Sequence, residues 1–288
     1  MPGFPSFVDL EFTARCNLKC GFCFGPADDG GKTPDLGLEF WIGVIDAIHS
    51  RGCSGIVVSG GEPTLYPHLK QLLACAQQWG MQTVLSTHGR HELRLLDVAQ
   101  NCDWIALPVD GVSKGSLVEM RGDSWGLARA DKLAKILKET TGGHVSIKLG
   151  SVATRLNRRE IGHLANLLLD LEPMNFDTWK IYQYTPRRKF ADRKEMYEIS
   201  DESFDSVRQD VEATGVTQRL NTVFSSNQRR RRAYLFVYPD GTVAIPNEGH
   251  SFGDTVIGNV ATDGVSVFDR VGAYEFFSNE ENFVTTYG

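Results

Sequence analysis

Three cysteines lie close together near the start of the chain, where the eight-residue segment 16–23 reads CNLKCGFC. A backbone that loops once can bring thiolates with this C-x3-C-x2-C spacing to one compact site. Soft thiolates bind iron–sulfur clusters, zinc or Cu(I) rather than Mg or Ca. A closed [4Fe–4S] cluster takes four cysteine ligands, but only Cys16, Cys20 and Cys23 are close in sequence. We therefore expect a cluster in which one iron is open to another ligand.

A structural zinc site is the alternative interpretation of the same three cysteines. It requires a remote fourth ligand, such as His49 or Cys53, and would make the chain a zinc-stabilised binding protein without catalysis. The remaining cysteines, Cys53, Cys75 and Cys102, lie in or beside expected helices without metal-ligand spacing. We expect them to be core or half-buried thiols.

The elements that would position the cysteine loop follow a regular pattern, in which short β-rich runs alternate with apolar residues at helical spacing. Six strands, five of them followed directly by a helix, predict β/α units and a mostly parallel sheet. Parallel connections are right-handed, so six such units curl into a full or partial barrel. The expected strands are Ser6–Thr13, Gly55–Ser59, Gln82–Ser86, Trp104–Val109, Val145–Val152 and Trp179–Tyr184, and the expected helices include Leu38–His49, Leu69–Trp79, Arg129–Lys138 and Ile161–Leu171.

The fold class expected from this pattern is α/β, with a partial (β/α)6 barrel of the TIM type over residues 1–187. Residues 188–288 are expected to form a C-terminal extension that covers the barrel mouth. Within it, Asp201 is predicted to cap a helix through Gly215, and the segment 239–241 (PDG) to turn a β-hairpin. A loose tail is expected over 279–288.

Polar motifs fall where these strands end, and the active sites of β/α barrels lie at the C-terminal ends of their strands. The cysteine loop follows the first strand, and Ser59-Gly60-Gly61-Glu62-Pro63 follows the second. Tandem glycines leave the backbone bare, so that its carbonyls can approach a ligand closely. Later strands carry or precede Ser86, His88, Arg121, Lys148, Ser151, Lys180 and Gln183.

One strand indicates which way its polar residues point. Val145, Ile147 and Leu149 share one face of the fifth strand, so Lys148 lies on the other face. This polar face is expected to line the barrel lumen.

The cysteine spacing with Phe22 before the last cysteine, together with the Gly-Gly-Glu-Pro motif, resembles the radical S-adenosylmethionine (SAM) superfamily. The resemblance implies that the open iron binds the amino and carboxylate groups of SAM. It also implies reductive cleavage of SAM to a 5′-deoxyadenosyl radical, which abstracts hydrogen from a substrate. Arg121 is expected to hold the SAM carboxylate, and His88 either contacts SAM or substrate or is structural. The implied SAM-binding residues are Ser59, Gly60, Gly61, Glu62, Pro63, Ser86, His88, Arg121 and Ser151.

Within this superfamily the chain is most similar to viperin-like enzymes, through the segments 16–24 (CNLKCGFCF), 148–152 (KLGSV), 179–183 (WKIYQ) and 226–228 (SNQ). Viperin-like enzymes convert nucleoside triphosphates to 3′-deoxy-3′,4′-didehydro products. The resemblance therefore implies a small-molecule substrate, such as a nucleotide or nucleotide-sugar, and an electron donor such as flavodoxin or ferredoxin. The implied substrate contacts are Lys148, Lys180, Gln183, Asn227, Arg229 and Arg230.

Three positions depart from the viperin pattern. Gly55, Gly150 and Thr178 stand where the family has a lysine, an asparagine and an arginine that hold the nucleotide and its phosphates. The run Arg229–Arg232 is a substitute, because arginine forks match phosphate geometry, or else it is a solvated charge run. Radical modification of a sugar, nucleoside or peptide in natural-product biosynthesis is therefore the alternative function.

The composition narrows the partners and the compartment. A net charge of −6 over 288 residues argues against nucleic acid as a partner. The sequence has neither an apolar stretch of about 18 residues nor a secretory signal pattern at its start, so we expect no membrane association. Six cysteines in such a chain predict the reducing cytoplasm, where clustered thiols more often bind metal than form disulfides.

Overall fold

The computed structural model describes residues 4–25, 33–187, 193–230, 234–246 and 253–274. Strands in these ranges form one sheet in the order β10-β9-β8-β1-β2-β3-β4-β5-β6-β7. All neighbours from β8 to β7 pair in parallel, whereas β9 pairs antiparallel with β8 and β10. The strands are β1 (Phe7–Glu11), β2 (Gly55–Ser59), β3 (Gln82–Ser86), β4 (Trp104–Pro108), β5 (Ser146–Ala153), β6 (Thr178–Gln183), β7 (Asn221–Ser225), β8 (Phe236–Val237), β9 (Thr242–Pro246) and β10 (Asp254–Asn259).

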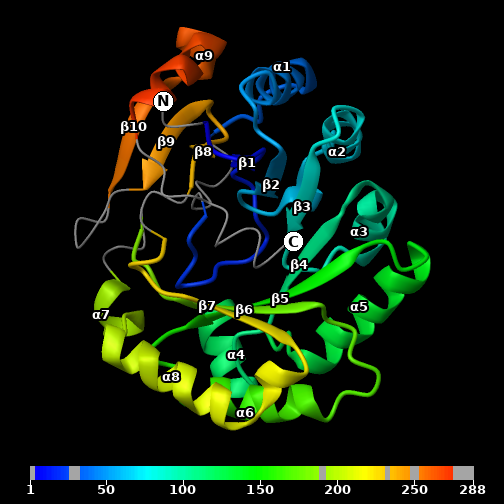
Figure 1. Ribbon diagram of the computed structural model, residues 1–288, viewed down its shortest axis with the longest axis vertical. Helices are drawn as coiled ribbons and strands as arrows, with labels where there is room; N and C mark the ends of the chain where they lie inside the picture. Colours follow the sequence, from blue (N-terminus) through cyan, green and yellow to red (C-terminus); the bar gives the residue numbers. More distant parts are fainter. Residues whose placement is uncertain (1–3, 26–32, 188–192, 231–233, 247–252, 275–288) are drawn as a thin grey trace.

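Helices follow the outer side of this curved sheet (Figure 1). The α-helices are α1 (Leu38–His49), α2 (Leu69–Gln78), α3 (Glu92–Val98), α4 (Lys114–Arg121), α5 (Leu127–Thr140), α6 (Arg158–Leu169), α7 (Lys194–Tyr197), α8 (Asp201–Ala213) and α9 (Val260–Asp263). Short 3-10 turns include η1 (Pro63–Leu65), η2 (Ala99–Asn101), η4 (Val216–Gln218) and η5 (Val265–Ala273). None of the helices in the described ranges has the length and apolar character that crossing a membrane requires.

The expected strands and their connecting helices are confirmed in β1–β6, and with them the α/β fold and its partial barrel. On α6, Ile161, Leu164, Ala165 and Leu168 are all buried against the sheet, as their helical spacing predicts. The same alternation of faces holds on β5, where Ile147 and Leu149 are fully buried in the main apolar core. The parallel arrangement brings the ends of β1–β6 to one edge, where the polar motifs lie.

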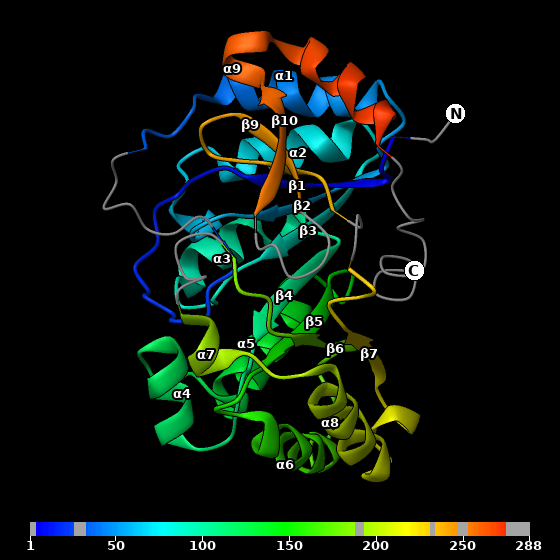
Figure 2. The ribbon, with the colours of Figure 1, turned by 90° about the vertical axis from the view of Figure 1, so that its left-hand side faces the viewer.

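Segments beyond residue 187 extend the sheet at both ends. β7 pairs in parallel with β6, and β8 pairs in parallel with β1 (Figure 2). The predicted hairpin is confirmed as β8 and β9, with Phe236 opposite Ala244. β7 was not expected, because its sequence NTVFS has only two apolar residues and no clear alternation. The boundary at residue 187 and the cover over the barrel mouth stay predictions, and the expected tail 279–288 lies outside the described residues.

The predicted helix cap at Asp201 is wrong by one residue. Ser200 is the N-cap of α8, and its hydroxyl accepts a hydrogen bond from the Ser203 backbone N–H at 3.2 Å. Asp201 is instead the first helical residue. Its carboxylate accepts hydrogen bonds from the side-chain amides of Gln183 and Gln228, at 2.9 and 3.1 Å. The acidic side chain therefore connects α8 to the strand ends rather than closing its own helix.

Glu160, in the first turn of α6, holds the start of α4 in place. Its carboxylate accepts hydrogen bonds from the backbone N–H groups of Val112 and Ser113, at 2.7 and 3.0 Å, and from the hydroxyls of Ser113 and Ser116. These bonds outweigh partial burial and lower the pKa of Glu160 to about 2. Because α4 ends at Arg121, this contact helps to place a candidate site residue.

We predict that Glu160→Gln lowers the free energy of unfolding by about 1 kcal/mol at pH 7, a figure that allows for solvent screening of a largely exposed group. A carboxyl with a folded pKa near 2 and an ordinary unfolded value near 4.5 stabilises the fold above pH 4.5 and loses that effect between pH 4.5 and 2. Urea unfolding across this range should therefore show a shallower acid dependence in the variant. The control is Glu39→Gln, an exposed acid in the first turn of α1. An equal effect of both substitutions would contradict the assignment.

Candidate active site

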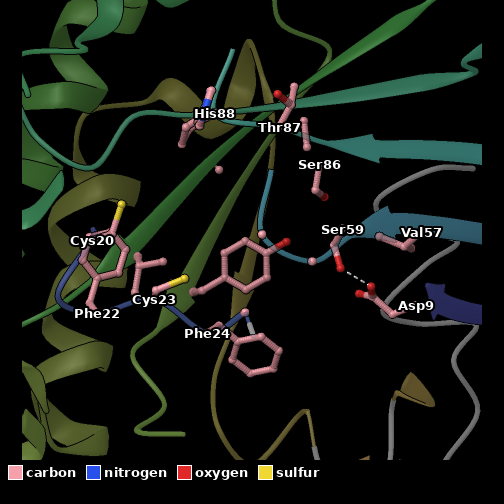
Figure 3. Close-up of a pocket in the computed structure, with 18 of the residues that line it drawn as sticks. Asp9, Cys20, Phe22, Cys23, Phe24, Val57, Ser59, Ser86, Thr87 and His88 are labelled. Carbon is pink, nitrogen blue, oxygen red and sulfur yellow. Dashed lines mark hydrogen bonds between the residues drawn. The ribbon is translucent and has the colours of Figure 1, made fainter. Parts of the chain in front are cut away.

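A cavity of about 350 Å³ opens at the edge where the parallel strands end. Its lining combines the cysteine loop after β1, the glycine-rich turn after β2 and the end of β3 (Figure 3). Polar residues of β5 and β6 complete it. The structure therefore brings most of the predicted site residues together. Those that line the cavity are Cys16, Cys20, Cys23, Ser59, Gly60, Gly61, Glu62, Ser86, His88, Arg121, Lys148, Lys180, Gln183 and Arg230.

Four predicted residues do not line it. Ser151 lies on the opposite face of β5, where its hydroxyl donates to the Val109 carbonyl and accepts from the Trp179 indole N–H at 2.9 Å. Pro63 begins the turn η1. Asn227 stands behind the lining, and Arg229 is exposed. Arg231 and Arg232 of the arginine run lie outside the described residues.

The cysteine loop offers three thiols to one space. Cys16, Cys20 and Cys23 all line the cavity, and Figure 3 shows Cys20 and Cys23 at its edge. Burial, together with the neighbouring Cys20 and Cys16, raises the pKa of the Cys23 thiol to about 11. Iron ligation removes such a proton outright. Three soft donors that line one cavity, with no fourth cysteine among the lining residues, fit a [4Fe–4S] cluster that has one open iron.

Neither of the two residues considered as a fourth zinc ligand, Cys53 and His49, lines the cavity. Cys53 precedes β2, at the opposite end of the barrel from the cysteine loop, and is 2% exposed within the core. His49 ends α1 and its ring packs on Trp79, with centroids 5.2 Å apart. In the part of the chain that the structure describes, no three or more His, Cys, Asp or Glu side chains are gathered as ligands for a single metal ion.

The two glycines after β2 are needed because backbone packs against them. A Cβ on Gly61 would lie 2.2 Å from the Arg15 carbonyl oxygen, and one on Gly60 would lie 2.6 Å from that of Thr13. The bare backbone was expected to admit a ligand, but here it admits the segment that leads into the cysteine loop. The N–H of Gly61 donates to Thr13 O and the N–H of Glu62 donates to Arg15 O, both at 2.8 Å. The turn and the loop are therefore one rigid unit.

Glu62 connects this unit to the end of β3. Its buried carboxylate accepts hydrogen bonds from the hydroxyls of Thr64 and Thr87, both at 2.6 Å, and from the backbone N–H of His88 at 2.9 Å. All four distances, including that to the Thr64 N–H, fall in the range of good hydrogen bonds. Glu62 therefore connects the ends of β2 and β3 by hydrogen bonds, and it also lines the cavity.

His88 extends this connection to the cysteine loop. Its Nε2 lies 2.8 Å from Asn17 Oδ1, and its Nδ1 accepts the N–H of Arg90 at 3.0 Å. Burial lowers the pKa of His88 to about 4, against an opposing effect of Glu62. The ring is therefore neutral at pH 7, with the proton on Nε2 directed at Asn17. This contact gives His88 a structural role next to Cys16.

Arg121 lies at the C-terminal end of α4, beside Cys20. Its guanidinium forms an ion pair with the fully buried Asp110 and lies 5.2 Å above the Phe22 ring. Its Nη1 is 4.0 Å from Cys20 Sγ. Asp110 also accepts the Val152 backbone N–H at 2.7 Å, which ties the pair to β5. The guanidinium is thus held at the edge of the cluster site.

Two lysines form the cationic side of the cavity. Lys148 and Lys180 are 4% and 2% exposed and come from adjacent strands, β5 and β6. The Lys148 Nζ donates to the Tyr182 hydroxyl at 3.3 Å, and the Lys180 Nζ lies 5.4 Å from the centre of that ring. Burial, then Lys148 and then Arg230, lower the pKa of Lys180 well below its usual value. Two buried amines on adjacent strands of one cavity wall form a site whose charged state an anionic ligand would stabilise.

Gln183, Asn227 and Arg230 form a hydrogen-bonded group beyond the ends of β6 and β7. The Gln183 side-chain oxygen accepts the Asn227 N–H at 2.8 Å, and the Asn227 side-chain oxygen accepts from Arg230 Nη2 at 2.5 Å. The Arg230 guanidinium also donates to the carbonyl of Ser225 at 2.7 Å. These side chains therefore join the ends of β6 and β7. Arg230 contributes positive charge to the cavity, but both of its Nη atoms are already hydrogen-bonded to protein groups.

Several lining residues were missed by sequence reasoning. Asp9 and Glu11 alternate on β1 and face the cavity, where Asp9 accepts a hydrogen bond from the Ser59 hydroxyl (Figure 3). Two acids spaced by two residues in an otherwise apolar strand were a usable signal. Tyr182 shares the face of Lys180 on β6, so strand alternation was a signal for it as well. Tyr234 and Phe236 had no such signal, because their place depends on how β8 joins β1.

Residues 10–168, more than half of the chain, match the family model described as the Radical SAM superfamily. The chain belongs to the radical SAM superfamily. The expected cofactors, a [4Fe–4S] cluster and SAM, are confirmed as those of this family. The matched residues include Cys16, Cys20 and Cys23, which line one cavity.

The radical SAM chain is also similar to two curated proteins named S-adenosylmethionine-dependent nucleotide dehydratase. One, from Flammeovirga pacifica, is 27% identical over 63% of this chain and 63% of its own length. The other, from Lacinutrix mariniflava, is 28% identical over 81% of this chain and 49% of its own. The chain thus spans about half to five eighths of these relatives. Their names confirm the resemblance to viperin-like enzymes.

Among solved structures, SuiB of Streptococcus suis bound to S-adenosylmethionine has the same fold as this radical SAM chain. The TM-score is 0.69 at 18% identity, over 92% of this chain and 66% of that one. At this identity the likeness confirms the fold.

We predict that Gly61→Ala disturbs the cysteine loop, because its Cβ would meet the Arg15 carbonyl at 2.2 Å. The backbone must shift, so the variant should lose roughly 1–3 kcal/mol of stability and bind less iron per chain after anaerobic reconstitution. The control is Gly43→Ala in α1, where an added Cβ meets nothing within 4 Å. That substitution should stabilise the helix by up to about 1 kcal/mol and leave iron content unchanged. Wild-type stability and iron content in Gly61→Ala would count against the close packing.

Proposed function

We propose that the protein abstracts a hydrogen atom from a nucleotide or a nucleotide-like small molecule whose acidic group binds Lys148 and Lys180. The observation that carries this proposal is the pair of buried lysines in the same cavity as the cluster cysteines. β5 and β6 are four and five strands away from β1 in the sheet, so the lysines reach the cavity from a different side than the cysteine loop. A substrate anchored by its anion would then extend toward the cluster.

The bound cofactors supply a 5′-deoxyadenosyl radical, and the chain's own residues decide what it meets. The apolar groups Phe7, Val57, Val84 and Trp104 form a small buried cluster, with Tyr234 packed on it, and Val57 and Tyr234 also line the cavity. Such a surface excludes water from the reacting part of a substrate. Tyr182, Tyr234 and Phe236 add aromatic faces that suit a nucleobase.

Two of the three positions that depart from the viperin pattern, Gly55 and Thr178, have structural explanations. A Cβ on Gly55 would lie 2.3 Å from the Phe7 ring, so the apolar cluster occupies the place of a longer side chain. Thr178 is buried and its hydroxyl accepts from the Asn221 amide at 3.1 Å. The cations left in the cavity wall are Lys148, Lys180, Arg121 and Arg230. The chain lacks a lysine and an arginine of the viperin pattern, so the test compounds below differ in their number of phosphates.

The alternatives follow from the same cavity. A sugar, nucleoside or peptide substrate in natural-product biosynthesis would use the radical chemistry but not the lysine pair. A zinc-stabilised binding protein would use neither. We also propose a one-electron donor of the flavodoxin or ferredoxin type, and the cytoplasmic location stays a prediction.

The function is tested by incubating the anaerobically reconstituted protein with SAM, a chemical reductant and a panel of compounds, and by measuring 5′-deoxyadenosine. The panel contains nucleoside mono-, di- and triphosphates of the common bases, nucleosides and nucleotide-sugars. We expect a nucleotide to increase 5′-deoxyadenosine formation at least tenfold over the level with SAM alone. Iron near four per chain is expected, with Cys20→Ala as the cluster-free control. If iron is bound but no phosphorylated compound stimulates cleavage, the nucleotide proposal fails, and zinc without iron would overturn the whole assignment.

We predict that Lys180→Met separates stability from binding. Removing a buried amine whose pKa is depressed by burial should leave the melting temperature unchanged or raised. Loss of a charge-assisted hydrogen bond should weaken binding of the stimulating nucleotide at least tenfold, measured by calorimetry. The control is Lys70→Met on α2, whose Nζ lies 2.7 Å from Asp97 and whose side chain is 53% exposed. Unchanged affinity in Lys180→Met would remove Lys180 from the substrate site.

A further inference from the structure

The end of α4 faces the cysteine loop with its carbonyl groups. The Gly21 N–H, between Cys20 and Cys23, donates to the Met120 carbonyl at 3.2 Å, and the Arg121 carbonyl lies 4.0 Å from Cys20 Sγ. The last carbonyls of a helix carry partial negative charge. A cluster bound to Cys20 would therefore meet negative potential from the backbone here, which opposes the gain of an electron.

The Arg121 side chain supplies the opposite charge at the same place. Its Nη1 is 4.0 Å from Cys20 Sγ, and its guanidinium carbon lies 5.2 Å over the ring of Phe22, the residue just before Cys23. The side chain is only 12% exposed, so water screens its charge weakly. A fixed cation beside a cluster thiolate stabilises the more negative, reduced state of the cluster.

Asp110 fixes that cation in position. Its side chain is fully buried, pairs with Arg121 Nε and accepts the Val152 N–H. The Asp110 carbonyl in turn accepts from Asn157, which is also fully buried. Asp110 therefore holds the guanidinium against Cys20 and Phe22, while its own negative charge partly offsets that of Arg121.

We propose that Arg121 is a positioning residue for the cluster loop whose charge raises the reduction potential of the [4Fe–4S] cluster, with Asp110 as the carboxylate that places and moderates it. The step concerned is the gain of one electron by the oxidised cluster from an external reductant. The inference depends on the family's cluster at Cys16, Cys20 and Cys23, but not on the substrate. It differs from a role in holding the SAM carboxylate, because it applies before SAM binds.

The test is a reductive titration of reconstituted protein without SAM or substrate, with dithionite or Ti(III) citrate and redox mediators. The reduced cluster is counted by its EPR signal at each solution potential, and iron per chain is measured for every sample. Arg121→Gln should lower the ratio of reduced to oxidised cluster at least tenfold at a fixed potential, which corresponds to 59 mV for one electron. Asp110→Asn should shift this ratio in the opposite direction.

Two further variants separate charge from folding. Arg121→Lys keeps the positive charge and should stay within about threefold of wild type. Arg90 forms the neighbouring ion pair with Asp123, and its guanidinium stacks on Trp125. Arg90→Gln removes an equal charge, and it should shift the ratio in the same direction as Arg121→Gln but by a smaller factor. If Arg121→Gln fails to bind iron, the potentials of Arg121→Lys and Asp110→Asn still test the proposal. A wild-type potential in Arg121→Gln, equal shifts in Arg121→Lys and Arg121→Gln, or a negative shift in Asp110→Asn would overturn the proposal.

Discussion

The close packing of the turn after β2 against the exit of β1 is the constraint on which the site depends. Cβ atoms at Gly60 and Gly61 would overlap the backbone of residues 13–15, so only glycines allow the two segments to approach. This approach places the N–H groups of Gly61 and Glu62 on the carbonyls of Thr13 and Arg15, immediately before Cys16. The direction in which the cysteine loop leaves the sheet is therefore set by main-chain hydrogen bonds, which do not depend on whether metal is bound.

Buried side chains connect this contact to the ends of the neighbouring strands. Glu62 joins the turn to Thr87 and His88, and His88 returns to the cysteine loop at Asn17. On the other side of the loop, Asp110 joins β5 to Arg121. The loop is thus held on one side by the hydrogen bonds of the buried Glu62 carboxylate and on the other by the ion pair of Asp110 with Arg121. Breaking either set of contacts would leave a buried charge uncompensated.

The sequence predicted the barrel and much of the polar lining of the cavity because both depend on local patterns. Strand-like runs followed by helical spacing identify β1–β6, and parallel strands bring their polar ends to one edge regardless of detail. Contacts made by distant segments were not predictable in this way. Asn227 and Arg230 join the ends of β6 and β7 because β7 pairs with β6, and the short sequence of β7 does not indicate a strand. Ser151 follows the strand's own alternation and faces the helices instead.

Charge is divided within the cavity in a way that matches two different tasks. On the side of the cysteine loop, Arg121 is paired with Asp110, and Arg90, which does not line the cavity, is paired with Asp123, so that their local field is moderate and fixed in direction. On β5 and β6 the two lysines lie close to each other and to Arg230, which lowers the pKa of Lys180. Like charges held together in this way cost stability that an anion can recover on binding. The paired region is therefore suited to a permanent cofactor, and the lysine region to a ligand that comes and goes.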